Sequence, residues 1–290
     1  MRKEIHSRQP WTKTISASRD RRQSAFLVWT LPPSLYVLTA WSLVHQSPPS
    51  HLLAPALTAS AFALLVVLLR AATIPAALLG AVICFNILTT SSTAASPHHR
   101  LWNISAFPAL IALFVLTFLA THYGRHRKQS DGLAESPHGR RTAQIAANLG
   151  IAGLCAIAGW QLACIAALAQ ATADTVSSEI GQALNAPTIL ITTGRPIPRG
   201  TDGGVSLAGT FYGIAAAAIL IILSTLTTHL PWAAALLCWL AAVAGLVCDS
   251  LLGATVERRG LLGNDLVNLA STAFTAALAL TLHALRIAAL

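Results

Sequence analysis

Long apolar stretches, separated by short polar breaks, fill most of this 290-residue chain. A helix needs about 20 mainly apolar residues to cross the hydrocarbon core of a membrane. The breaks divide the first half of the chain into four segments near that length, predicted as spans at residues 25–45, 52–70, 72–94 and 101–123. The second half contains three clear further spans, predicted at residues 207–229, 231–252 and 265–290.

The apolar run at residues 142–173 is too long for one span. A single helix of that length would measure about 48 Å, against a hydrocarbon core of about 30 Å. The sequence Gly159-Trp160-Gln161 interrupts the run near its middle. We therefore expect a tight hairpin of two helices, at residues 142–158 and 161–181. The predicted fold class is all-α, a polytopic transmembrane helical bundle of about nine spans.

Composition supports a membrane protein, since 54% of the residues are hydrophobic and only 10% are charged. A soluble domain carries about 25% charged residues. The net charge of +9 does not indicate nucleic-acid binding, because the Lys and Arg residues lie beside predicted spans without interleaved aromatic residues. The five cysteines all lie in apolar runs and form no Cys-x-x-Cys pair, so we expect buried thiols.

The distribution of positive charge predicts the orientation and the organisation of the chain. Lys and Arg favour the cytoplasmic side of a membrane. We expect a basic cytoplasmic arm at residues 1–24, membrane spans at 25–123, a basic cytoplasmic loop at 124–141, and a membrane domain with the active site at 142–290. The protein is then a multi-pass protein of a bacterial inner membrane with a cytoplasmic N-terminus. The hairpin also places the loops at 182–206 and 253–263 in the cytoplasm, where nucleotides are.

Acidic residues gather in the second half of the chain, close to the predicted spans. Six of the ten carboxylates lie there, namely Asp174, Glu179, Asp202, Asp249, Glu257 and Asp265. A carboxylate at bilayer depth costs about 2.5–3.5 kcal/mol, so such a group of acids favours a functional site. Glu257 is the exception, because with Arg258 and Arg259 it is expected to be solvated in a cytoplasmic loop.

Asp174 and Glu179 lie too far apart around a helix to share one face. They serve two sides of one site, or one of them alone is catalytic, or both are solvated at the end of a helix. Asp249 ends an otherwise uncharged apolar run and is therefore expected to face the bundle or an aqueous cavity. Helix capping explains Asn264 and Asp265, but Asn268 lies one turn further along and has no such local role.

A glycine-rich segment precedes the predicted span at 207–229. Glycines let backbone N–H groups approach an anion, and the start of a helix offers free N–H donors. The segment is not a Walker A motif, because no Gly-Lys-Ser/Thr follows, and a plain re-entrant loop is the alternative. The candidates for phosphate or substrate binding are Arg195, Arg199, Gly200, Thr201, Gly203, Gly204 and Ser206, with Asn264 and Asn268 from the last span. The candidate catalytic residues are Asp174, Asp202, Asp249 and Glu179, of which the three aspartates are candidate Mg²⁺ ligands.

Four motifs, in this order, resemble the phytyl-phosphate kinase family of integral membrane proteins. They are Ala-Thr-Ala-Asp-Thr-x-x-Ser-Glu-Ile-Gly at 171–181, Gly-Thr-Asp-Gly-Gly-Val-Ser-Leu-x-Gly-Thr at 200–210, Asp-Ser-Leu-Leu-Gly-Ala-Thr at 249–255, and Asn-Asp-x-Val-Asn at 264–268. The resemblance extends over about residues 72–290. Val176 departs from it, standing where a Trp is usual, and the hairpin around Gly159 is shorter than is typical.

The resemblance implies a phosphoryl transfer at the membrane, with a distant similarity to dolichol kinases and phosphatidate cytidylyltransferases. The donor would be a nucleoside triphosphate, CTP or ATP, with Mg²⁺, and the acceptor an isoprenoid (phytyl-like) monophosphate that becomes the diphosphate. The expected partners are therefore this isoprenoid phosphate, the nucleotide and the lipid bilayer, and no nucleic acid. The alternative is an ion-coupled transporter or flippase of a lipid or anionic solute, in which buried acids would bind coupling ions.

Overall fold

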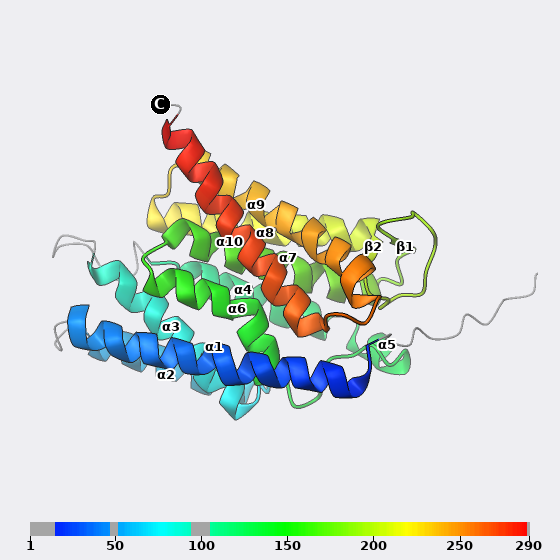
Figure 1. Cartoon of the computed structure of the whole chain (residues 1–290), viewed down its shortest axis with the longest axis horizontal. Helices are drawn as coiled ribbons and strands as arrows, with labels where there is room; N and C mark the ends of the chain where they lie inside the picture. The colour runs from blue at the N-terminus through cyan, green and yellow to red at the C-terminus, as the bar shows by residue number, and fades with distance from the viewer. Residues whose placement is uncertain (1–14, 47–51, 94–104, 289–290) are drawn as a thin grey trace, which may run out of the picture.

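The computed structural model describes residues 15–46, 52–93 and 105–288, and helices account for most of them (Figure 1). The predicted all-α bundle is confirmed. The helices are α1 (Ala17–Gln46), α2 (Leu53–Leu68), α3 (Ile74–Thr93), α4 (Phe107–His122), α5 (Arg125–Ser130), α6 (Thr142–Ile157), α7 (Gln161–Ala183), α8 (Leu207–Thr228), α9 (Trp232–Leu252), the π-helical turn η2 (Gly253–Glu257) and α10 (Asn264–Ala288).

One small sheet interrupts this helical pattern and was not predicted. Strands β1 (Thr188–Leu190) and β2 (Gly204–Ser206) pair antiparallel, with Thr188 opposite Ser206. The segment between them includes most of the glycine-rich residues. The sheet therefore ties both ends of this loop together directly before α8 begins.

The predicted hairpin is confirmed as two helices. α6 ends at Ile157 and α7 begins at Gln161, and Gly159 between them has a φ of +75°. Only glycine adopts such a left-handed conformation without steric cost, so a two-helix hairpin can turn within three residues here.

Four of the described helical segments are long and apolar enough to cross a membrane. They are Ala17–His45, Leu207–Thr228, Trp232–Glu257 and Asn264–Ala288. Four shorter apolar helices accompany them, Leu53–Leu68, Ile74–Thr89, Phe107–His122 and Thr142–Ile157. The chain is thus a multi-pass membrane protein, whereas nine complete spans remain a prediction.

Successive long helices alternate in direction, which brings several connections together at one end of the bundle. Arg19 at the start of α1 donates a hydrogen bond to the carbonyl of Gly260 (2.6 Å), and Arg127 donates to the carbonyl of Ala183 (3.0 Å). We call this end, formed by the start of α1 and the connections at 69–73, 123–141, 184–206 and 253–263, the loop end. It lies on the right in Figure 1, beside α5 and the two strands. The hairpin prediction requires this arrangement, because two helices between residues 142 and 183 return the chain to its starting side.

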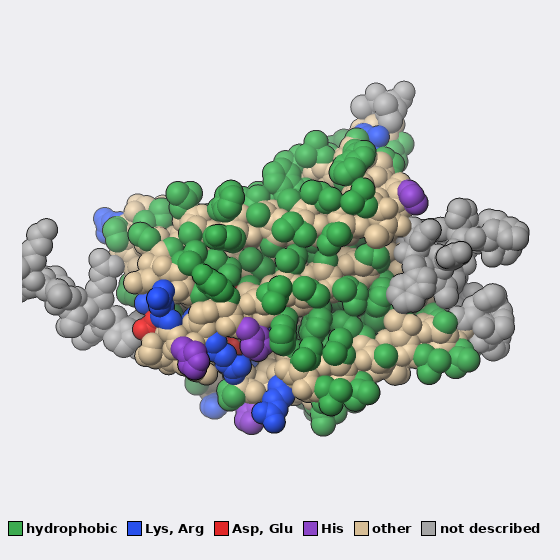
Figure 2. Space-filling model, turned by 180° about the vertical axis from the view of Figure 1, so that it is seen from behind, with side chains coloured by type: hydrophobic (Ala, Val, Ile, Leu, Met, Phe, Trp, Pro, Cys, Tyr) green, Lys and Arg blue, Asp and Glu red, His purple; other side chains and the backbone are tan. Residues whose placement is uncertain are grey.

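Helix α7 lies at the centre of the bundle, packed against α4, α6, α8, α9 and α10. Every residue from Ala163 to Ala173 is buried. Small residues allow this close packing, since a Cβ at Gly213 of α8 would contact the carbonyl oxygen of Ala173. The outer surface is largely hydrophobic, and most of the charged side chains gather towards the loop end (Figure 2). Because its neighbours shield it from lipid, α7 can carry polar groups.

Cysteine labelling tests the arrangement of the loops. In a variant without the five native cysteines, single cysteines at the exposed positions Gln129, Asn185 and Arg259 should react with a membrane-impermeant maleimide from the same side of the membrane, expected to be the cytoplasmic side. A cysteine at Trp160, in the hairpin turn, should react only from the opposite side. Reaction of the Asn185 and Trp160 positions from one common side would contradict the two-helix hairpin.

Candidate active site

A polar cavity of about 270 Å³ opens at the loop end, and it brings the four sequence motifs together. Its walls come from α6, α7, the connection between α7 and α8, the end of α9 and the start of α10. Of the residues predicted from the sequence, it is lined by Asp174, Glu179, Arg199, Gly200, Thr201, Asp202, Gly204, Ser206, Asp249, Asn264 and Asn268. Segments separated by up to about ninety residues thus meet at one site.

Asp174 and Asp249 form the centre of this cavity. Their half-buried carboxyl groups, from α7 and α9, lie in hydrogen-bonding contact with each other. Ser271 Oγ donates a further hydrogen bond to Asp249 Oδ1 (2.8 Å). Two carboxylates at this separation repel each other unless a proton or a cation lies between them. The pair therefore marks a place where the protein favours positive charge.

Polar side chains from α6, α7 and α10 support the Asp249 carboxylate. With its side-chain amide oriented so that the nitrogen faces acceptors, Asn268 donates to Asp249 Oδ1 (3.3 Å), and its amide group also lies 3.0 Å from that of Asn148. Gln170 Nε2 donates to Ser271 Oγ (3.1 Å). Asn268, which helix capping did not explain, thus orients the carboxylate.

Arg140 supplies positive charge beside the Asp174–Asp249 pair and was not among the site residues predicted from the sequence. Its guanidinium group lies 3.5 Å from Thr175 Oγ1 and close enough to Asp174 to interact electrostatically with it. The Arg140 backbone is bonded on both sides, donating to Ala71 O and accepting from Thr73 N (both 3.0 Å). The sequence signal for this residue was Gly139-Arg140-Arg141, directly before α6. Gly139 has a φ of +79° and packs against the backbone of the α2–α3 turn, and so places Arg140 beside that turn.

The glycine-rich loop is shaped by its own packing. Gly203 has a φ of +72°, and a Cβ there would overlap the backbone of Ala254 in η2. Gly203 is not part of the cavity lining, and this close approach gives it a structural role, whereas its predicted part in phosphate binding stays a prediction. Ser206 caps α8 by accepting a hydrogen bond from Gly209 N (3.1 Å).

The two arginines of this segment differ in their surroundings. Arg199 lines the cavity and forms an ion pair with Asp131 (3.1 Å). Arg195 is exposed and outside the cavity lining, and its carbonyl accepts a hydrogen bond from Leu190 N (2.9 Å). The structure therefore keeps Arg199 near the other predicted residues and does not bring Arg195 to them.

Glu179 forms a buried ion pair with Lys128, whose side chain is 1% exposed. Lys128 Nζ also donates to the carbonyls of Thr121 (2.8 Å) and Ala120 (3.2 Å). This network joins α4, α5 and α7 at one wall of the cavity. These contacts indicate that Glu179 helps to position the helices at this wall. A catalytic role for Glu179 stays a prediction.

Glu257 was expected to be solvated in a loop, and the structure corrects this expectation. It is 3% exposed and interacts electrostatically with Asp249. The reason is η2, which continues α9 past Leu252 for one π-helical turn, wider than an α-helical turn, and places Glu257 inside. Asp265 is also buried, and it accepts a hydrogen bond from Ser24 Oγ of α1 (2.6 Å).

The oxygen-rich lining suits a hard divalent cation, although the carboxylates do not form a complete ligand cage. Among the described residues, no group of three or more His, Cys, Asp and Glu side chains is arranged to hold a metal ion. Mg²⁺ binds through one or two carboxylates together with substrate phosphates, so the Asp174–Asp249 pair fits this ion. That Asp202 binds the metal ion together with Asp174 and Asp249 stays a prediction.

Comparison with known proteins places the chain in a family of membrane proteins. The model of the integral membrane protein DUF92 family matches residues 56–276, which include all four motifs, so the chain belongs to this family. The resemblance predicted from the motifs is thereby confirmed at the level of the family.

Three relatives illustrate this membership. An uncharacterized membrane protein of Synechocystis sp. is 33% identical over 187 residues, 60% of this chain and 72% of the relative. Protein VTE6, chloroplastic, of Arabidopsis thaliana is 31% identical over 185 residues, 58% of this chain and 56% of the relative. An uncharacterized membrane protein of Methanocaldococcus jannaschii is 35% identical over 170 residues, 56% and 70% of the two chains. No solved structure matches the chain.

The close approach of Gly203 to Ala254 predicts a large loss of stability on adding one methyl group. Gly203→Ala should lower the apparent melting temperature of the purified protein much more than Gly194→Ala. Both glycines have positive φ, but a Cβ at Gly194 meets nothing within 4 Å. Gly194→Ala therefore reports only backbone strain of about 1–2 kcal/mol, whereas Gly203→Ala adds a steric overlap. Equal shifts for the two variants would refute the packing role of Gly203.

A double-mutant cycle separates the structural and catalytic roles of Glu179. Glu179→Gln and Lys128→Met should each destabilise the protein by about 3–5 kcal/mol, because each leaves one buried charge without its partner. The double variant should recover much of that loss in thermal unfolding. If the double variant is stable but has lost turnover in the assay proposed below, Glu179 acts in catalysis as well.

Proposed function

We propose that this protein is a membrane kinase that transfers a phosphoryl group from a nucleoside triphosphate to an isoprenoid monophosphate, giving the diphosphate. The observation that carries the proposal is the meeting of the Asp174–Asp249 pair, the glycine-rich loop and Arg140 in one polar cavity of an otherwise apolar bundle. Most of the residues lining this cavity come from the four motifs that resemble the phytyl-phosphate kinase family, and the relative VTE6 supports that family.

Phosphoryl transfer needs positioning and charge neutralisation more than covalent help from the protein. An oxygen of the acceptor phosphate forms a bond to the γ-phosphorus of the nucleotide, while the bond to the bridging β,γ-oxygen breaks and that oxygen keeps the electron pair. Both reactants are anions, so positive charge must lie between them. Arg140 and Arg199 line the cavity and provide cationic groups that match phosphate oxygens in geometry.

The carboxylates are better suited to hold a cation than to remove a proton. A phosphate monoester has a second pKa of about 6, so the acceptor is largely ionised at neutral pH and needs no general base. Asp174 and Asp249, with nearby amide oxygens, would hold Mg²⁺, which when bound neutralises charge on the phosphates. Asn268 and Ser271 keep the Asp249 carboxylate in place, and the surrounding helices keep lipid out.

Replacing either central carboxylate tests the proposal directly. Asp174→Asn and Asp249→Asn should each reduce formation of prenyl diphosphate by about a hundredfold or more, because cation binding contributes several kcal/mol to such a reaction. Membranes containing the protein would be given labelled prenyl monophosphate, Mg²⁺ and CTP or ATP. Asp20→Asn, outside the cavity lining, is the matched control and should leave turnover unchanged.

Two results would reject this function. One is the absence of any diphosphate from the unaltered protein with either nucleotide. The other is an Asp174→Asn or Asp249→Asn variant that inserts normally and keeps full turnover. Ion-dependent movement of a lipid or anion across vesicles without phosphoryl transfer would instead favour the transporter alternative.

A further inference from the structure

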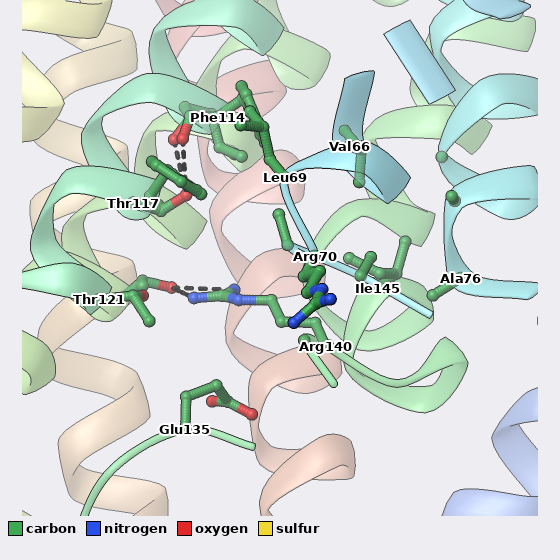
Figure 3. A pocket seen from close by; sticks show the side chains of 18 of the residues that line it. Val66, Leu69, Arg70, Ala76, Phe114, Thr117, Thr121, Glu135, Arg140 and Ile145 are labelled. Atoms are coloured by element: carbon green, nitrogen blue, oxygen red, sulfur yellow. Dashed lines mark hydrogen bonds between the residues drawn. The ribbon is translucent and has the colours of Figure 1, made fainter. Parts of the chain in front are cut away.

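A second cavity, of about 280 Å³, lies among α2, α3, α4 and α6 and is mainly apolar. Figure 3 shows its two chemically different ends: Val66, Leu69 and Phe114 lie on one side, and Arg70, Arg140 and Glu135 lie towards the other. An apolar space that ends in cationic groups matches an amphiphile with an anionic head.

This apolar cavity adjoins the polar cavity and shares part of its wall. The residues that line both are Glu135, Arg140, Asn148 and Thr175. Arg140 lies at the junction, held by its backbone hydrogen bonds to the α2–α3 turn and contacting Thr175 through its side chain. A molecule with its chain in the apolar cavity would thus place its head group beside the Asp174–Asp249 pair.

The charged side chains that line the apolar cavity are more often positive than negative. Arg70, Arg125 and Arg140 line it, together with Glu135, which accepts a hydrogen bond from Gln144 Nε2 (3.2 Å). Within the described part of the chain, the ion pairs are Lys128–Glu179 and Arg199–Asp131. None of the three arginines is in an ion pair there, so Arg70 and Arg125 can contact an anionic ligand together with Arg140, which also interacts electrostatically with Asp174.

We infer that the apolar cavity holds the isoprenoid chain of the acceptor, with its phosphate bound at Arg140 and Arg70. The inference rests on the proposed function and adds the location of the lipid substrate. The lining shared with the polar cavity favours this occupant over a bilayer phospholipid, because a monophosphate head at Arg140 adjoins the carboxylates directly. The depth of the cavity along α3 would then limit the accepted chain length.

Gly80 of α3 gives a sharp test of this location. It lines the cavity, and a Cβ added there meets nothing within 4 Å, so open space surrounds this position. Gly80 lies about 9 Å beyond the start of α3 at the loop end, at 1.5 Å per residue. A leucine at this position therefore obstructs the far part of a long chain but leaves space for one isoprene unit near Arg140.

We expect Gly80→Leu to raise KM for a phytyl-length monophosphate by about tenfold, since the chain loses apolar contacts. Turnover of a monophosphate with a single isoprene unit should stay unchanged. Ala61→Leu is the control, because it places a leucine on the exposed surface of α2, outside the cavity lining, and should alter neither value. If Gly80→Leu keeps the chain-length profile of an active unaltered protein, the cavity assignment is wrong while the proposed function stands.

Photolabelling tests the location independently of turnover. A prenyl monophosphate with a diazirine on its last isoprene unit should label α3 or α4 in the unaltered protein, and Gly80→Leu should reduce that labelling about tenfold. Excess unlabelled phytyl monophosphate should compete, whereas phytol or phospholipid should not. Equal competition by phospholipid would identify a bilayer lipid as the occupant and overturn the inference. Specific labelling without any kinase activity would retain the binding site and reject the proposed function.

Discussion

The contact between the Asp174 and Asp249 carboxyl groups is the constraint on which the rest of the structure depends. Two acids inside a helical bundle are costly unless hydrogen bonds and positive charge compensate them. The surrounding elements supply both, through Ser271 and Asn268 of α10 and Arg140 before α6. Each of these groups needs its helix close to α7, so the packing of the bundle is part of the chemistry of the site.

Small residues make that packing possible where the helices cross. Gly245 of α9 lies one turn before Asp249, and a Cβ there would overlap Thr275 of α10 and contact Gln170 of α7. Glycine at this position lets three helices meet closely, as in other membrane bundles. The same three helices carry Asp174, Asp249 and Asn268. The central helix can be the more polar one, since lipid contacts its neighbours instead.

Features encoded locally could be predicted from the sequence, and features that depend on long-range packing could not. The break at Gly159, the helical segments and the position of Asp249 at a polar cavity follow from apolar length, glycine and the rarity of buried acids. Arg140 and Asn148 were missed because their positions beside α7 depend on how α6 docks. The pairing of Lys128 with Glu179 joins residues 51 apart. Glu257 was assigned to solvent because its inward turn depends on the π-helical geometry of η2, which no local pattern of residues indicates.

The position of Arg140 explains how α2 and α3, which carry no acids, adjoin the polar cavity. Arg140 O and N are bonded to the turn between α2 and α3, so this arginine has one fixed position relative to both cavities. Arg70, in the same turn, is held with a φ of +54°, a conformation that is costly for a non-glycine residue and is stable only when its surroundings enforce it. The turn therefore couples the apolar cavity, formed largely by α2, α3 and α4, to the polar cavity at α7. If the proposed amphiphile binds there, different helices would contact its head group and its chain, and Arg140 would lie where the two parts meet.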